Sequence, residues 1–175
     1  MDLQDLLFDS SRRTADMAVG VIGNNPEIFK TMLDFAFEDK NLYAMRAARV
    51  IQLASHNHPE LVRPYLREII LRLPNLKNEG LKRGMAKILI ERSFDHDEET
   101  LGILVSTCFD WLMNPDEKPA IKVYAMEILF KSSKFYPEIK SELIFSIEDQ
   151  LPKSGTAVRT RGKQILTKLY KQVLG

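Results

Sequence analysis

The chain has 175 residues, of which 45% are hydrophobic and 28% are charged, and this composition excludes a disordered protein. Its 25 basic and 24 acidic residues leave a formal net charge of +1, so the total charge indicates no class of partner. The single cysteine, Cys108, excludes an intrachain disulfide and a thiolate metal site. The length predicts one domain over residues 1–175.

No apolar run approaches the roughly 20 residues that a membrane-spanning helix needs. The first five residues include two acids, Asp2 and Asp5, and the N-terminus lacks the basic start and long apolar stretch of a signal peptide. We therefore expect a cytoplasmic protein without a membrane partner.

The spacing of apolar residues is helical almost throughout. In the segment 59–73 they recur at steps of three and four residues, and the segment 139–151 follows the same pattern. Strict alternation and Asn-Gly or Asp-Gly turns are missing from the sequence, which argues against strands. The predicted class is all-α, with breaks near residues 39–41, 74–77, 114–117 and 151–154.

Two kinds of helix alternate along the chain. Residues 26–28, 59–61 and 137–139 each read Pro-Glu followed by Ile or Leu, which suits the first turn of a helix. A second kind of helix keeps a common register, with steps of 38, 40 and 37 residues between its equivalent positions Val50, Ile88, Ile128 and Ile165. A period near 40 residues built from two helices is typical of a helical solenoid.

These second helices resemble the HEAT repeats, whose pattern is an acidic residue, a Val-Arg pair and a small residue three positions after the Arg. Asp116 precedes residues 121–125, which read Ile-Lys-Val-Tyr-Ala, and residues 158–162 read Val-Arg-Thr-Arg-Gly. Residues 81–85 match with Met85 at the small position, whereas residues 43–47 lack the basic residue at its usual place.

The resemblance implies a right-handed alpha-alpha superhelix of four to five helix pairs. We expect an N-terminal cap over 1–25, where Asp9 and Ser10 would cap a helix, and repeats at about 26–55, 59–93, 97–134 and 137–173. The small column predicts equivalent helix–helix contacts at Ala47, Met85, Ala125 and Gly162.

The sequence carries no catalytic motif, metal site or cofactor site that we can identify. His56 and His58 are two residues apart and do not share a helix face, and His96 is the only other histidine. Cys108 lies in an apolar stripe, which is typical of a buried thiol. We expect a protein that is not an enzyme.

HEAT-like repeats also build alkylpurine DNA glycosylases, whose site needs tryptophans, an Asp and an Arg. The single tryptophan, Trp111, and the nearest following acid, Asp116, leave this alternative open, although helix packing is the favoured role for Trp111.

Charge separates the two kinds of helix. The second-helix segments 40–55, 77–93, 118–134 and 153–172 carry a net charge of +15, and the first-helix segments 26–39, 59–73, 95–117 and 137–150 carry −12. Because the second helices of HEAT-like solenoids line the concave face, the resemblance implies a basic inner groove.

Some of these cations have a structural explanation, because the family's Val-Arg column commonly forms a ladder between repeats. Its members here are Lys82, Lys122 and Arg159. The cations outside this column are the predicted binding residues: Arg46, Arg49, Arg83, Lys87, Arg161 and Lys163. We expect Arg161 and Lys163 to stand outside structural contacts. The predicted partner is an acidic protein or peptide segment, and nucleic acid is the alternative.

Overall fold

We describe the fold from a computed structural model, in which residues 2–92 and 97–175 are described. These residues form helices and connecting turns and contain no strand, so the predicted all-α class is confirmed. The chain divides into two compact units, which we call unit 1 (Met1–Asp95) and unit 2 (His96–Gly175). The prediction of one repeat domain over 1–175 concerns both units together and stays a prediction. Among the described residues, no helix combines the length and apolar character needed to cross a membrane.

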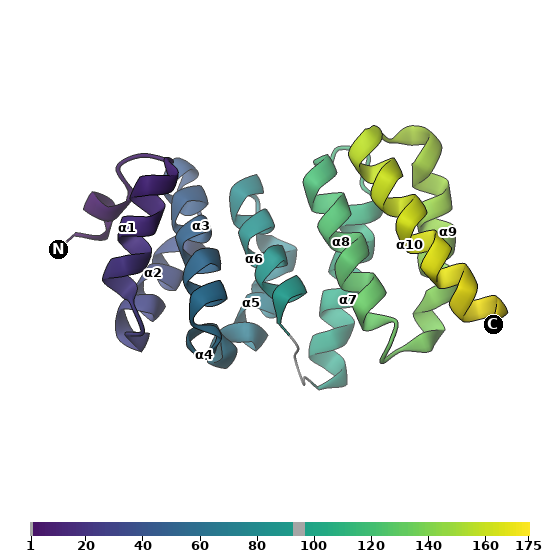
Figure 1. The fold of residues 1–175 in the computed structure, drawn as a ribbon, viewed down its shortest axis with the longest axis horizontal. Coiled ribbons are helices and arrows are strands. Elements are labelled where there is room, and N and C mark those ends of the chain that lie inside the picture. Colours follow the sequence, from purple (N-terminus) through teal and green to yellow (C-terminus); the bar gives the residue numbers. More distant parts are fainter. Residues whose placement is uncertain (1, 93–96) are drawn as a thin grey trace. The chain divides into compact units, whose positions relative to one another are not determined.

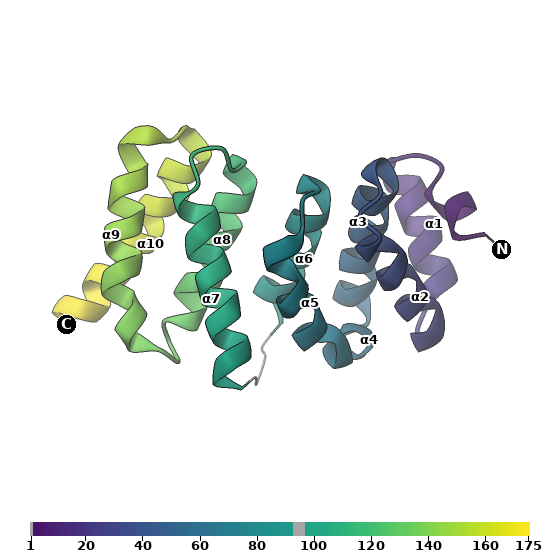
Figure 2. The same ribbon diagram turned by 180° about the vertical axis from the view of Figure 1, so that it is seen from behind.

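Unit 1 is a stack of helix pairs in two layers. The helices α1, α3 and α6 form one layer, seen from the front in Figure 1, and α2, α4 and α5 form the other, seen in Figure 2. The helix α3 packs against α1, α2 and α6. The elements are η1 (Leu3–Leu7), α1 (Arg12–Ile22), α2 (Pro26–Phe37), α3 (Asn41–Asn57), α4 (Pro59–Val62), η2 (Arg63–Tyr65), α5 (Leu66–Arg72), η3 (Leu73–Asn75) and α6 (Glu79–Glu91).

Unit 2 contains two further helix pairs. The helices α8 and α10 form its front layer in Figure 1, and α7 and α9 form the layer facing the viewer in Figure 2. The helix α8 packs against α7, α9 and α10. The elements are α7 (Glu98–Met113), α8 (Pro119–Ser132), η4 (Pro137–Ile139), α9 (Lys140–Gln150), η5 (Leu151–Lys153) and α10 (Thr156–Leu174). With the short η1–α1 pair, the described residues thus form the predicted four to five helix pairs.

Capping residues explain why the helices begin where they do. Asn25, Asn78 and Asp97 each accept a backbone N–H from the first turn of the helix that follows, which satisfies donors that have no partner inside the helix. All four predicted breaks fall at the connections between successive α-helices, and two of them, at 74–77 and 151–154, overlap the 3₁₀ turns η3 and η5. The predicted cap at Asp9 and Ser10 is wrong by one residue, because Ser11 accepts from the Thr14 N–H.

The first-helix segment 59–73 is interrupted, although its apolar spacing predicts a continuous helix. The structure resolves it into α4, η2, α5 and η3. Pro64 lies in the first 3₁₀ turn, η2. A proline inside a helix has no N–H to donate, and its ring clashes with the carbonyl four residues earlier. The apolar spacing does not reveal this interruption, whereas the proline does.

Small residues set the closest approach between helices. Ala47, Met85 and Ala125 are fully buried, in agreement with the predicted column. A Cβ added to Gly162 would lie 3.0 Å from Ile147 Cγ2, so α10 lies directly against α9 at this point. In unit 1, Gly84 of α6 lies close to the preceding second helix, α3, because a Cβ added there would lie 3.0 Å from Ala48 Cβ.

Candidate functional site

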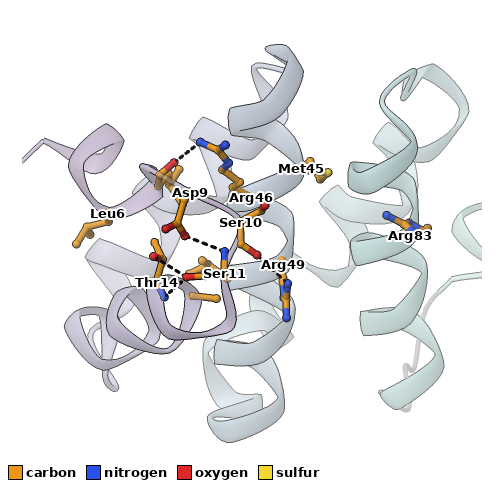
Figure 3. A pocket seen from close by; sticks show the side chains of 12 residues that line it. Leu6, Asp9, Ser10, Ser11, Thr14, Met45, Arg46, Arg49 and Arg83 are labelled. Carbon is orange, nitrogen blue, oxygen red and sulfur yellow. Dashed lines mark hydrogen bonds between the residues drawn. The ribbon is translucent and has the colours of Figure 1, made fainter.

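Three of the four predicted binding residues of unit 1 lie around a cavity of about 280 Å³. Arg46 and Arg49 of α3 and Arg83 of α6 line it, together with the loop between η1 and α1 (Figure 3). Three apolar side chains, Leu6, Met45 and Val50, also contribute to its wall. The helices α3 and α6 therefore bring three of the predicted binding residues to one cavity.

Arg46 holds the N-terminal segment against α3. Its Nη1 donates hydrogen bonds to the carbonyl oxygens of Leu7, at 2.8 Å, and Phe8, at 3.0 Å. Carbonyls at the end of a helical turn have no partner within the turn, so a guanidinium here stabilises the end of η1. The Nε of Arg46 is buried and has no hydrogen-bond partner among the residues that the structure describes. Arg46 is thus engaged in structural contacts, and its role in binding stays a prediction.

Asp9 places a carboxylate in the same cavity. Hydrogen bonds from the Thr14 and Ser11 side chains and from the Ser11 backbone hold the pKa of Asp9 below its usual value, and the charge of Arg46 acts in the same direction. The distance from Ser11 N to Asp9 Oδ1 is 2.8 Å. The cavity is therefore not uniformly basic. The three short polar residues before α1, residues 9–11, were the sequence signal for this carboxylate site, and a count of charges by helix does not detect it.

Arg49, Arg83 and Lys87 form no ion pair with a carboxylate in the part of the chain that the structure describes. Arg49 is exposed and donates only to the Ser10 carbonyl oxygen, at 3.2 Å. Arg83 is half-buried and Lys87, one turn further along α6, is exposed. Neither side chain forms a hydrogen bond or ion pair with the residues that the structure describes. We call Arg49, Arg83 and Lys87 the open cation group.

The two predicted binding residues of unit 2, Arg161 and Lys163, differ in their contacts. Arg161 of α10 pairs with Glu127 of α8 and donates a second hydrogen bond to Gln164 Oε1 at 2.7 Å. The hydrogen bond that Arg161 donates to the Glu127 carboxylate raises the pKa of Arg161. The expectation that Arg161 stands outside structural contacts is therefore wrong, whereas Lys163 is exposed on α10.

Lys122, a member of the predicted ladder column, is buried. Its Nζ donates to Gln150 Oε1 at 2.8 Å, which joins α8 to α9 of the neighbouring pair. Burial lowers the pKa of Lys122. Lys82 is half-buried and Arg159 is exposed, and a ladder role for these two residues stays a prediction.

The residues considered for other chemistry are dispersed. The Nδ1 atom of His56 lies 3.4 Å from Glu91 Oε2, and the Nδ1 atom of His58 lies 3.2 Å from Glu60 Oε1. His96 lies outside the described residues. Within the described ranges no three His, Cys, Asp or Glu side chains gather into a metal-binding group.

Cys108 and Trp111 belong to the core of α7. Cys108 is fully buried, and this burial raises the pKa of its thiol, so a reactive thiolate is disfavoured. Trp111 is 6% exposed, as expected for helix packing. Asp116 is exposed in the connection to α8.

Comparison with known proteins agrees with this helical-repeat architecture. A family model described as a HEAT repeat domain matches residues 4–169. No curated protein and no solved structure gives a significant match. The paired helices, the repeat period and the family match together show that the chain belongs to the HEAT repeat domain family.

Proposed function

We propose that this protein is a non-catalytic binding scaffold and that it binds an acidic segment of another protein. The binding surface is the face of α3 and α6 that carries the open cation group, which we call the basic second-helix layer. HEAT repeats commonly form scaffolds that bind proteins, which supports the first part of the proposal. The charge distribution of unit 1 supports the second part.

The observation that carries the proposal is a contrast between the two layers of unit 1. In the first-helix layer, Lys30 pairs with Asp34 and lies 3.6 Å from Glu68, which also pairs with Arg72. In the second-helix layer, the open cation group forms no ion pair with the residues that the structure describes, and Arg49 donates to a backbone carbonyl oxygen. Neutralised cations have little attraction left for a ligand, whereas neighbouring cations without counter-charges sum to a positive potential.

The cavity suits side chains of a bound segment. Its volume of about 280 Å³ is near the lower end of the range for small-molecule sites, so it fits one or two side chains better than a large cofactor. Arg49 and Arg83 supply guanidinium groups, which bind carboxylates with paired hydrogen bonds. The apolar part of the wall would receive an aliphatic side chain next to those carboxylates.

The test is fluorescence anisotropy with a labelled peptide of alternating Glu and Leu, at low and moderate salt. The variant Arg83→Gln/Lys87→Gln should weaken binding at least fivefold, because it removes two cations of the open cation group. The matched control is Arg63→Gln/Lys77→Gln, which removes two exposed cations outside that group and should change affinity less than twofold.

Labelled duplex and single-stranded DNA are measured in parallel. Stronger binding of DNA than of the acidic peptide, with affinity falling steeply with salt, would contradict the proposed protein partner and support the nucleic-acid alternative. Equal peptide binding by both variants would contradict a role for the open cation group.

A further inference from the structure

A second surface lies on the layer of unit 2 that α7 and α9 form, and its lining residues are suited to binding a peptide. A groove of about 170 Å³ lies between the first half of α7 and the segment at η4. Figure 2 shows the start of α7 and the connection from α8 to α9 at the same end of this unit. Its apolar lining residues, each partly exposed, are Leu101, Val105, Tyr136 and Ile139.

Gly102 forms the open part of this groove. A Cβ added there would meet no atom within 4 Å, so no close approach requires a glycine. Its φ is also not in the left-handed region, so the backbone does not require one. Glycine in a helix interior costs about 1 kcal/mol relative to alanine. Gly84 and Gly162 have packing reasons to be glycine, whereas the effect of Gly102 is to leave the groove open.

The groove has an acidic rim. Glu98 and Glu138 line it from its two sides. Their surroundings are acidic as well, since α7 contains three acidic residues and no basic one. The segment 137–150 adds four acidic residues against the single cation Lys140. Apolar walls between two carboxylates are complementary to an apolar side chain with cations beside it.

We propose that this α7–η4 groove binds a basic peptide segment of a partner protein, with an aliphatic side chain seated over Gly102 and flanking Lys or Arg residues paired with Glu98 and Glu138. This site is separate from the basic layer and opposite to it in charge preference. The protein would then bind an acidic segment on unit 1 and a basic segment on unit 2.

The probe is a fluorescein-labelled peptide of alternating Lys and Leu, measured by anisotropy. The matched peptides replace every Lys with Glu or every Leu with Ser. The parent protein should bind the Lys-Leu peptide at least tenfold more tightly than the peptide without Leu. The Glu-Leu peptide serves as a site control: Gly102→Leu should leave its binding unchanged, because the proposed function assigns that peptide to unit 1. Glu98→Gln/Glu138→Gln should lower the affinity and its salt dependence, because the two rim charges are removed.

The decisive variant is Gly102→Leu, which adds an apolar side chain to the groove lining at a position where a Cβ has open space, and it should weaken binding of the Lys-Leu peptide at least tenfold. Its matched control is Gly20→Leu, because Gly20 is also an exposed helical glycine with open space around its Cβ position, and it lies in unit 1. Gly20→Leu should leave the affinity unchanged. Failure of the parent to bind the Lys-Leu peptide, or equal binding by the Gly102→Leu and Gly20→Leu variants, would overturn the proposal.

Discussion

The Arg161 guanidinium of α10 donates a hydrogen bond to the Glu127 carboxylate of α8, so a charged contact joins the second helices of the two pairs in unit 2. The two side chains are 32% and 19% exposed, so water screens their attraction only in part. This pairing removes Arg161 from the cations available to a ligand. Substitutions at Arg161 therefore test whether this ion pair stabilises the contact between the two helix pairs.

Reversal of the charge at Arg161 should destabilise unit 2. In Arg161→Glu two carboxylates face each other, and we expect the free energy of unfolding to fall by about 1–2 kcal/mol. The double variant Glu127→Arg/Arg161→Glu should recover most of this loss. Urea unfolding of the parent, both single variants and the double variant measures the coupling. Additive effects of the two substitutions would contradict the ion pair.

Alanine substitutions at two glycines should have opposite effects on stability. A Cβ at Gly84 would lie 3.0 Å from Ala48 Cβ and 3.1 Å from the Ala48 carbonyl oxygen, so Gly84→Ala should cost about 1–3 kcal/mol by overpacking. Gly102→Ala should instead raise the free energy of unfolding by about 0.5–1 kcal/mol, since the position is open and helical. Chemical denaturation of both variants checks the difference. A stabilising effect of Gly84→Ala would show that α3 and α6 do not approach as described, and a destabilising effect of Gly102→Ala would show that the Gly102 position is not open.

Ala125 provides a separate test of the small-residue column. Its side chain is fully buried in α8, so Ala125→Leu should force neighbouring side chains apart and cost about 1–3 kcal/mol. Thermal or urea unfolding gives the value. A variant with the parent's denaturation midpoint would mean that this position does not face the helix contact.

Asp9 should contribute to stability in a pH-dependent manner. Its pKa is lowered in the folded protein from the usual 3.8, so the ionised form is favoured by folding. The contribution is therefore present above about pH 4 and is lost as the pH falls through the lowered pKa. The stability difference between the parent and Asp9→Asn should be largest at neutral pH and shrink as the pH falls below the usual pKa of 3.8. A difference independent of pH would contradict the hydrogen bonds from Thr14 and Ser11.

The repeat architecture is predictable from the sequence because it depends on periodic features. Three such features can be found in the sequence without a structure: the register from Val50 to Ile165, the prolines at helix starts and the breaks between helices. The interruption at Pro64 is also visible, but a search for apolar periodicity passes over it. Helix class and helix order therefore follow from the sequence.

The state of each charged side chain is less predictable. Arg46, Arg83 and Arg161 are equivalent in a count of charges, yet Arg46 binds backbone carbonyls, Arg161 binds Glu127 and Arg83 remains unpaired within the described residues. These outcomes depend on which atoms of distant residues come within about 3 Å, a distance that spacing along the chain does not specify.

The most direct test of the central claim is a ¹⁵N–¹H NMR titration of the arginine Nε–Hε signals with the Glu-Leu peptide. The proposed function predicts that the signals of Arg49 and Arg83 shift in a saturable manner, because their guanidinium groups bind the added carboxylates. The signals of Arg12, paired with Asp16, and of Arg63 should stay in place. Saturable shifts at Arg63 with none at Arg49 and Arg83 would contradict the claim that the basic second-helix layer binds an acidic segment.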